Sequence, residues 1–205
     1  MKKIIQKEDP LLRETAKEID PKEITSPRVV KILQEMKIAL LSQEDGVAIA
    51  APQIGYSYRI FIIATQFLPK KRSPELVPEK KKKEHFVFIN PVITKLSRDK
   101  RDMEEGCLSV RYLYGKVLRS QKATIVAYDE NGNKFTQGAS GLLAQIFQHE
   151  VDHLNGILFI DTARYVEEIL PRPTKSQIKN LPTQLTKVKN SRVDKLTSSH
   201  DSPLK

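Results

Sequence analysis

Two histidines stand four residues apart in the stretch QHEVDHLNG, residues 148–156, and a glutamate directly follows the first of them. Side chains at positions i and i+4 of an α-helix lie one turn apart on the same face, so His149 and His153 can reach one metal ion. Glu150 would lie beside that ion, where its carboxylate can take a proton from metal-activated water. The spacing therefore predicts a hydrolytic metal site, with a helix that merely carries two histidines as the simpler alternative.

The third protein ligand decides the class of such a site. Phe159 stands where a metzincin would place its third histidine, which excludes that class. A thermolysin-like enzyme would use a downstream glutamate, here Glu167 or Glu168, or in principle His200. Upstream, Cys107 offers a thiolate, and one thiolate with two imidazoles leaves a fourth position open for water. We predict Cys107 as the third ligand, although an inert buried thiol is the simpler interpretation of this residue taken alone.

The length and composition of the chain limit the kind of protein that carries this site. Its 205 residues suit one domain with appendages, and its single cysteine cannot form an internal disulfide, which favours a reducing compartment. No apolar run approaches the roughly 18 residues of a membrane span, and the first residues lack the apolar segment of a secretory signal. We therefore expect neither a membrane protein nor a secreted one, and the bacterial cytoplasm is favoured over an organelle.

The formal charge of +10 is concentrated in two segments. Residues 69–83 carry seven basic and two acidic residues, and residues 164–205 carry nine and four. Such segments are typical of contact with a polyanion, although solvated charge runs are common on any surface. We expect one folded domain over residues 1–168 with a basic insert at 69–84, followed by a basic, mobile tail over residues 169–205.

Two regular elements are predicted before the insert. Residues 27–44 place apolar side chains at helical spacing, with Ser26 as a candidate N-cap, and so predict a helix packed on the core. Residues 58–64 form an apolar, β-branched and aromatic run that is typical of a buried strand. The glycine-bounded stretch between them, residues 46–55, contains Pro52 and is expected to be a loop rather than a central strand.

The second half of the chain is expected to contain strands before its helix. Residues 86–96 show two short strand-like runs that meet at an Asn-Pro pair, and residues 104–110 are expected to form a loop. The turn at Asn131 and Gly132 predicts a hairpin within residues 123–137.

The helix that carries both histidines has its own boundary residues. Ser140 is a candidate N-cap, and Gly156 is expected to end the helix. The face that bears the histidines also carries Ile146. Residues 157–161 are then expected to form a short extended piece.

Three stretches together resemble the motifs of the peptide deformylase family. They are GVAIAAPQIG at residues 46–55, EGCLSV at residues 105–110 and QHEVDHLNG at residues 148–156, in the family's order and at similar separations. The resemblance extends over most of the chain and leaves out the basic insert and the tail. It implies an α+β fold in which the metal-binding HExxH helix packs among small antiparallel β-sheets. It also implies a hydrolase that removes the formyl group from the N-terminal formyl-methionine of newly synthesised polypeptides.

The resemblance further implies a role for each matching residue. The metal ligands would be Cys107, His149 and His153. The ion would be divalent, usually iron(II), with zinc, nickel or cobalt able to occupy the site. Glu150 would act as general base and later as general acid, while Gln53 and the backbone N–H of Leu108 would bind the oxyanion. Hydrolysis of a formamide needs these parts, because it requires a hydroxide at neutral pH, which the metal provides, and donors aimed at the new negative oxygen.

The substrate of such an enzyme, a nascent N-formyl-methionyl polypeptide, must enter in extended form, and residues 46–48 resemble the family segment that pairs with its backbone. Ala48 stands where the first motif normally has glycine, so its Cβ would narrow the cleft or exclude a positive φ. Residues 111–119 are a second departure, because the second motif is usually followed soon by proline. The residues expected to bind the substrate are Gly46, Val47, Ala48, Glu105, Gly106 and Ile146.

Two other functions compete with this one. A zinc endopeptidase would use Glu167 or Glu168 as its third ligand and would cleave internal bonds of unformylated peptides. A ribosome- or nucleic-acid-associated binding protein would keep the fold without the activity and be recruited by its basic insert and tail. Because all the implied catalytic residues are present, we expect an active enzyme. We expect no contact with a membrane, and we expect the basic insert or the tail to contact the ribosome.

Overall fold

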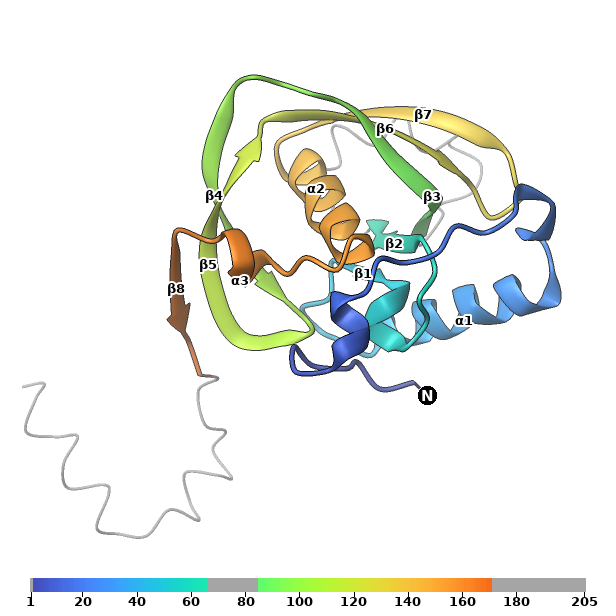
Figure 1. Cartoon of the computed structure of the whole chain (residues 1–205), viewed down its shortest axis with the longest axis horizontal. Coiled ribbons are helices and arrows are strands. Elements are labelled where there is room, and N and C mark those ends of the chain that lie inside the picture. Colours follow the sequence, from blue (N-terminus) through green and yellow to red (C-terminus); the bar gives the residue numbers. More distant parts are fainter. Residues whose placement is uncertain (1, 66–84, 171–205) are drawn as a thin grey trace, which may run out of the picture. The chain divides into compact units, whose positions relative to one another are not determined.

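The structure is a computed structural model that describes residues 2–65 and 85–170. The predicted basic insert and all but the first two residues of the predicted tail lie outside these described residues. The elements described below belong to the first of two compact units, Met1–Ile169. They form an α+β fold in which helix α2, the predicted metal-binding helix, lies among antiparallel β-sheets (Figure 1), as expected. The domain boundary after residue 168 stays a prediction.

The larger sheet has five strands in the order β1-β2-β3-β6-β7, and every neighbouring pair is antiparallel. The predicted buried strand within residues 58–64 is confirmed, and so is the hairpin, whose turn places Gly132 at φ 82°. The loop expected over residues 46–55 is instead a short edge strand followed by a 3-10 turn. The strands are β1 Ala48–Ala50, β2 Ile60–Ala64, β3 His85–Leu96, β6 Lys122–Tyr128 and β7 Lys134–Ser140.

Strand β3 differs from the prediction of two separate runs. It is one strand that continues through Asn90 and Pro91, where its pairing with β6 shifts register and Asn90 adopts φ 49°. A bulge lets the strand pass a proline, which has no N–H to donate to a neighbour. The side chain of Asn90 accepts a hydrogen bond from the backbone N–H of Ile19 at 2.9 Å, a distant contact that no local pattern reveals.

The smaller sheet has the order β4-β5-β8 and is also antiparallel. Its strands are β4 Lys100–Cys107, β5 Val110–Ser120 and β8 Tyr165–Glu168. The loop expected at residues 104–110 was wrong, because Cys107 is the last residue of β4 and the chain turns at once into β5. Strand β8 was missed because all of its side chains are exposed, so its sequence carries no pattern of burial.

Helix α1 spans Pro27–Leu41, and the hydroxyl of Ser26 accepts from the N–H of Val29 at 3.4 Å, which confirms the predicted N-cap. The 3-10 helices in the described part of the chain are η1 Pro10–Arg13, η2 Pro21–Glu23 and η3 Ala51–Ile54. No helix among the described residues is long and apolar enough to cross a membrane.

Helix α2 spans Leu142–Leu154, close to the predicted range. Its N-cap is Gly141, at φ 61°, and Ser140 is the last residue of β7, so the prediction of Ser140 as the cap was wrong. The extended piece expected at residues 157–161 was also wrong, because helix α3 occupies Phe159–Thr162. The carboxylate of Asp161 accepts from the N–H of Leu158 at 2.8 Å and so holds this helical turn.

Strand β2 fixes the positions of the two longer helices because both of its faces are buried. Alternate side chains of a strand point to opposite faces. Ile60 and Ile62 pack in one core cluster with Met36 of α1, whereas Phe61 packs in another cluster with Phe147 of α2. Helices α1 and α2 therefore cover opposite faces of the larger sheet, and α2 rests on a rigid support.

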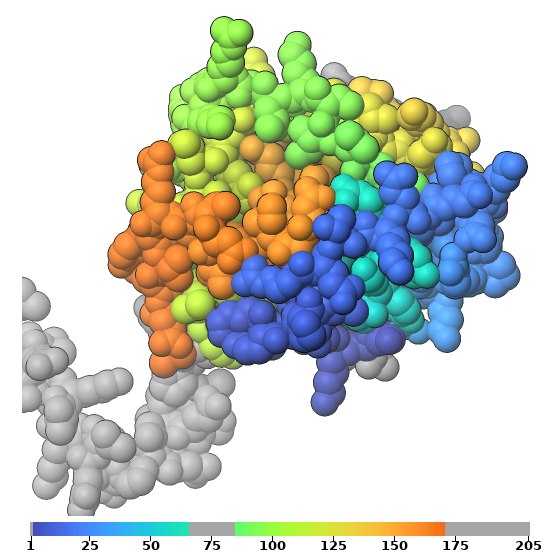
Figure 2. Space-filling view, viewed as in Figure 1, coloured from blue at the N-terminus to red at the C-terminus, as the bar shows by residue number. Residues whose placement is uncertain are grey.

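The chain leaves α2 through a close backbone contact. Gly156 adopts φ 74°, and a Cβ at this position would lie 2.5 Å from the carbonyl oxygen of Arg13. Arg13 belongs to the first segment of the chain, which packs against the residues that follow α2 in Figure 2, blue against orange. Glycine is needed here both for the left-handed backbone and for the close approach.

We expect Gly156→Ala to lower the free energy of unfolding by roughly 2–4 kcal/mol, because the left-handed strain of a Cβ and the clash with Arg13 add. Gly138→Ala is the matched control, since a Cβ there meets nothing within 4 Å. Urea unfolding followed by circular dichroism measures both. Equal stability of the two variants would contradict the role assigned to Gly156.

Candidate metal centre

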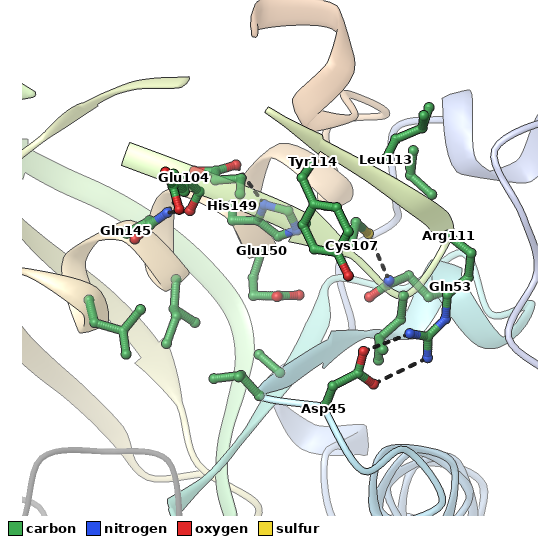
Figure 3. A pocket seen from close by; sticks show the side chains of 18 of the residues that line it. Asp45, Gln53, Glu104, Cys107, Arg111, Leu113, Tyr114, Gln145, His149 and Glu150 are labelled. Atoms are coloured by element: carbon green, nitrogen blue, oxygen red, sulfur yellow. Dashed lines mark hydrogen bonds and ion pairs between the residues drawn. The ribbon is translucent and has the colours of Figure 1, made fainter. Parts of the chain in front are cut away.

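The three predicted metal ligands lie together. The candidate ligand atoms of Cys107, His149 and His153 are all within 4.8 Å of one another. The Sγ of Cys107 lies 3.1 Å from Nε2 of His153. Both histidines project from α2, whereas Cys107 comes from the end of β4, and Figure 3 shows Cys107 beside His149. The fold therefore joins a helix and a strand at one cluster of donor atoms.

The other candidates for the third ligand do not join this cluster. Glu167 and Glu168 are exposed residues of β8 and pair through their backbone with β5. His200 lies outside the described residues. Phe159, at the position of the metzincin histidine, is buried and stacks on His149 with ring centroids 6.4 Å apart. Of the residues that the structure describes, Cys107 is the one that completes the pair of histidines.

A buried arginine holds His149 in place through Glu105. Arg119 donates from Nε and Nη2 to the two carboxylate oxygens of Glu105, at 2.7 and 3.0 Å, and from Nη1 to Asp152 at 2.5 Å. Glu105 in turn lies 2.9 Å from Nδ1 of His149. A histidine whose Nδ1–H is held by a carboxylate presents Nε2 as its ligand atom, in a fixed ring orientation. Arg119 and Glu105 therefore position a candidate metal ligand.

The charges of this group shift its pKa values. Burial would raise the pKa of Glu105, but hydrogen bonds from His149 and Arg119 lower it to about 2. Burial also opposes ionisation of Cys107, yet the charges of His153 and His149 and their hydrogen bonds lower its pKa to about 5. The pKa of His149 is raised well above its usual value because its bonds to Cys107 and Glu105 outweigh burial. The lowered pKa favours the thiolate form of Cys107, which is the form that binds a metal.

Glu150 is a buried carboxylate that lacks a full set of partners. It is 4% exposed, and its Oε2 has no hydrogen-bond partner among the described residues. Burial raises its pKa to about 7, although the charges of His149 and His153 oppose this shift. An unpaired buried oxygen is costly and calls for a missing partner such as water. The unpaired oxygen and the adjacent thiolate and imidazoles together fit a divalent metal ion and its water.

Gln53 lies on the other side of the cluster, in η3, and is 2% exposed. Its Oε1 accepts from the backbone N–H of Ala50 at 2.8 Å. Because that N–H can only donate, the amide group cannot be turned round. Its Nε2 therefore faces Ser109 Oγ at 3.1 Å and Cys107 Sγ at 3.4 Å. The glutamine of the first motif is thus a fixed donor beside the ligand cluster.

A cavity of about 320 Å³ opens beside these side chains (Figure 3). Most of the predicted site residues line it, whereas Gly46 and His153 are not among the lining residues. The predicted residues that line the cavity are Val47, Ala48, Gln53, Glu105, Gly106, Cys107, Leu108, Ile146, His149 and Glu150.

Ala48, the departure in the first motif, does not strain the backbone. Asn90 and Tyr112 are the non-glycine residues with positive φ in the described part of the chain, so a positive φ is not required of Ala48. It sits in β1, paired with Ile63. Its methyl group lines the cavity, and narrowing of the cleft is the remaining way in which it can act.

Sequence reasoning missed the residues that support the site. Arg119 has no local signal, because its partners Glu105 and Asp152 are 14 and 33 positions away along the chain. Asp152 precedes His153 within the recognised motif, so its place beside the centre was visible from the sequence even though its partner was not. Arg111 and Tyr114 were not missed: they belong to the segment identified as the second departure, and they line the cavity from β5.

Fold and site together define a class of protein, the hydrolases that use a metal ion held by one cysteine and the two histidines of an HExxH helix. The family model described as polypeptide deformylase matches residues 1–168. The chain belongs to this family. Membership supports a hydrolase that acts on the formyl group of an N-terminal methionine, and it implies a divalent metal at the cluster.

Individual relatives agree with the family match. A peptide deformylase of Carboxydothermus hydrogenoformans is 39% identical over 161 residues, covering 78% of this chain and 92% of the relative. Peptide deformylase 1A, chloroplastic/mitochondrial, of Arabidopsis thaliana is 37% identical, but the match covers only 60% of that longer protein and 77% of this chain. The crystal structure of peptide deformylase from Thermotoga maritima superimposes with a TM-score of 0.68 at 29% identity, over 80% of this chain and 99% of that one.

We expect Arg119→Ala to weaken metal binding by about ten- to a hundredfold, because Glu105 loses the partner that keeps it charged and aligned with His149. Competition with a chelator, under conditions where circular dichroism shows folded protein, measures the affinity. Arg28→Ala is the control, since it removes an exposed arginine whose pair with Glu23 lies apart from the cavity lining. Equal metal affinity in the two variants would rule out a positioning role for Arg119.

Proposed function

We propose that the protein removes the formyl group from the N-terminal formyl-methionine of newly synthesised polypeptides, by hydrolysis at one divalent metal ion. The observation that carries this proposal is the meeting of three metal-ligand side chains with the unpaired carboxylate oxygen of Glu150. Membership of the family supports the same activity. The bacterial cytoplasm suits it, because a reducing compartment keeps Cys107 available as a thiolate.

Cys107, His149 and His153 would hold the ion. For His149 the ligand atom is Nε2, because Nδ1 is held by Glu105. When bound, the ion lowers the pKa of water to about 7 and so supplies hydroxide at neutral pH. We propose iron(II), the ion that the resemblance to the family implies. Zinc, nickel or cobalt can substitute for it in this proposal, because one thiolate and two imidazoles suit several of these metals.

Glu150 moves the proton in this proposal. As a carboxylate it takes a proton from the attacking water, and as an acid it gives that proton to the amine nitrogen that leaves. Burial raises the pKa of Glu150 to about 7 in the metal-free chain, and a general acid or base works best with a pKa near the operating pH. Its Oε2, which has no partner among the described residues, is the atom available for this transfer.

Gln53 and the backbone N–H of Leu108 would stabilise the formyl oxygen as it becomes negative. The Nε2 of Gln53 already points toward the centre, since Ala50 holds the opposite end of the amide. A neutral amide suits this role because it donates without competing for the metal. Donors fixed in advance stabilise the transition state because they need no rearrangement during the reaction.

The substrate would bind as an extra strand. Among the described strands, β1 lies at an edge of its sheet, so its outer backbone groups can pair with an extended peptide. Gln53 follows the end of β1, whereas Gly46 precedes its start. A peptide with its formyl group near Gln53 would therefore run antiparallel to β1 toward Gly46. The methionine side chain would enter the part of the cavity that Ile146 of α2 lines.

Glu105 and Ala48, both expected to bind the substrate, have more limited roles in this proposal. Glu105 lines the cavity, but its carboxylate is engaged by Arg119 and His149, so it orients a ligand. Ala48 adds a methyl group next to the path of the peptide. Contact with the ribosome, through the basic insert or the tail, remains a proposal about residues outside the described ranges.

Mass spectrometry tests the proposed function directly. Anaerobically purified, iron-loaded protein is incubated with formyl-Met-Ala-Ser and, separately, with a longer peptide that has a free amino end. Loss of the formyl group from the first and no change in the second are expected. Cleavage of internal bonds would support the competing function, a zinc endopeptidase. Absence of any reaction by metal-loaded protein would reject both activities.

We expect Glu150→Ala and Cys107→Ala to fail for different reasons. Glu150→Ala should keep about one metal ion per chain while kcat falls by about 10²–10⁴, the usual contribution of a general base. Cys107→Ala should lose the metal itself, because a ligand is removed. Elemental analysis beside a deformylation assay separates the two effects. Persistent turnover in Glu150→Ala, or full metal occupancy in Cys107→Ala, would contradict the roles assigned.

A further inference from the structure

One ion pair joins the two walls of the cavity. Arg111, at the start of β5, donates from Nη1 to Oδ2 of Asp45 at 2.7 Å and from Nη2 to Oδ1 at 3.4 Å. The same Nη2 donates to Oε1 of Gln43 at 2.6 Å. Asp45 and Gln43 belong to the segment between α1 and β1, on the opposite wall. A bidentate contact of this kind, strengthened by a third acceptor, holds a long side chain in one geometry.

The ion pair lies at one end of the cavity. Asp45 and Arg111 both line it, and Figure 3 shows them at the end opposite to Gln145 and Glu104, with Glu150 between. Gln145 and Glu104 mark the side on which α2 lines the cavity, where the methionine side chain would enter. The Arg111–Asp45 pair therefore marks the side on which the rest of the peptide would leave.

The direction of the peptide along β1 leads to the same end. A chain that starts near Gln53 and runs antiparallel to β1 passes Ala48 first and then Gly46. Asp45 is the next residue along this path. The residue that follows the methionine must therefore pass close to the Arg111–Asp45 pair.

We propose that Arg111 is a specificity-determining residue, whose bridge to Asp45 narrows the exit of the cleft and favours substrates with a small residue directly after the methionine. This inference rests on the proposed function. Arg111 belongs to residues 111–119, the second departure from the family's motifs, so the bridge is a feature of this chain's own segment. Tyr112, beside it, is held at φ 66°, and its carbonyl oxygen accepts from the N–H of Ile169 at 2.8 Å, which fixes the backbone that carries Arg111.

The strength of the bridge limits its effect. The side chain of Asp45 is 59% exposed and that of Arg111 is 30% exposed, so water competes with the ion pair. A bulky substrate can enter by breaking the bridge, and its penalty cannot exceed the free energy of that contact. Exposed pairs of this kind correspond to about two- to fivefold in an equilibrium constant. The bridge thus tunes substrate preference and does not block any substrate.

The experiment measures kcat and KM for formyl-Met-Ala-Ser and formyl-Met-Trp-Ser, which differ only in the residue after the methionine. In Arg111→Ala and in Asp45→Ala, the ratio of kcat/KM for the Trp peptide to that for the Ala peptide should rise about two- to fivefold, mainly through KM. Removing both side chains should give no larger rise than removing one. Exchanging them, as Asp45→Arg with Arg111→Asp, should bring the ratio back toward the wild-type value.

Arg164→Ala is the matched control, because Arg164 forms a comparable exposed ion pair with Asp102 at 3.2 Å and does not line the cavity. It should keep the wild-type ratio. Formyl release with a ratio that neither Arg111→Ala nor Asp45→Ala changes would overturn this inference alone. Absence of formyl release from both peptides by the wild-type protein would overturn the proposed function and the inference with it.

Discussion

The buried guanidinium of Arg119 is the charge on which the geometry of the site depends. It lies on β5, whereas its partners Glu105 and Asp152 lie on β4 and α2, so one side chain ties three elements together. A charge removed from water must be paired and fully hydrogen-bonded, or it destabilises the fold. The pairing here is possible only when the smaller sheet and α2 meet in one arrangement. That same arrangement brings Cys107 to His149.

The larger sheet supplies the rigid support that this network needs. Because β2 is buried on both faces, α2 cannot shift without disturbing the aromatic packing of Phe61, Phe88 and Phe147, whose ring centroids lie 4.5–6.3 Å apart. Packed interiors of this density resist small displacements. The ligands are thus held by regular elements, while the cavity between β1 and β5 is bounded on one side by an exposed ion pair that can open. This difference in burial makes the candidate ligands more rigid than the Arg111–Asp45 ion pair.

Features that leave a local pattern in the sequence were predictable, whereas features that depend on partners far away along the chain were not. The helix at residues 27–44 and the buried strand at 58–64 were confirmed because burial leaves a local pattern. The motifs also located the donor cluster. In contrast, the bulge that makes β3 continuous depends on Asn90 and a contact with Ile19, and β8 depends on backbone pairing with β5 alone. Arg119 was missed for the same reason, since nothing near it in the chain indicates a buried partner.

Two buried glutamates show how surroundings, not residue type, assign chemical roles. Glu105 is met by a guanidinium and an imidazole, and its pKa falls to about 2, so it stays charged and can only orient. Glu150 is buried with one oxygen unpaired, and burial raises its pKa to about 7, a shift that suits the proton transfer proposed for it. Carboxylates whose pKa values are pushed apart in one site are suited to different tasks. Arg119 holds Glu105, Glu105 orients His149, and Glu150 is the next residue after His149 in the helix. The charge on Arg119 and the proton transfer proposed for Glu150 therefore depend on one arrangement, so loss of the first should disturb the second.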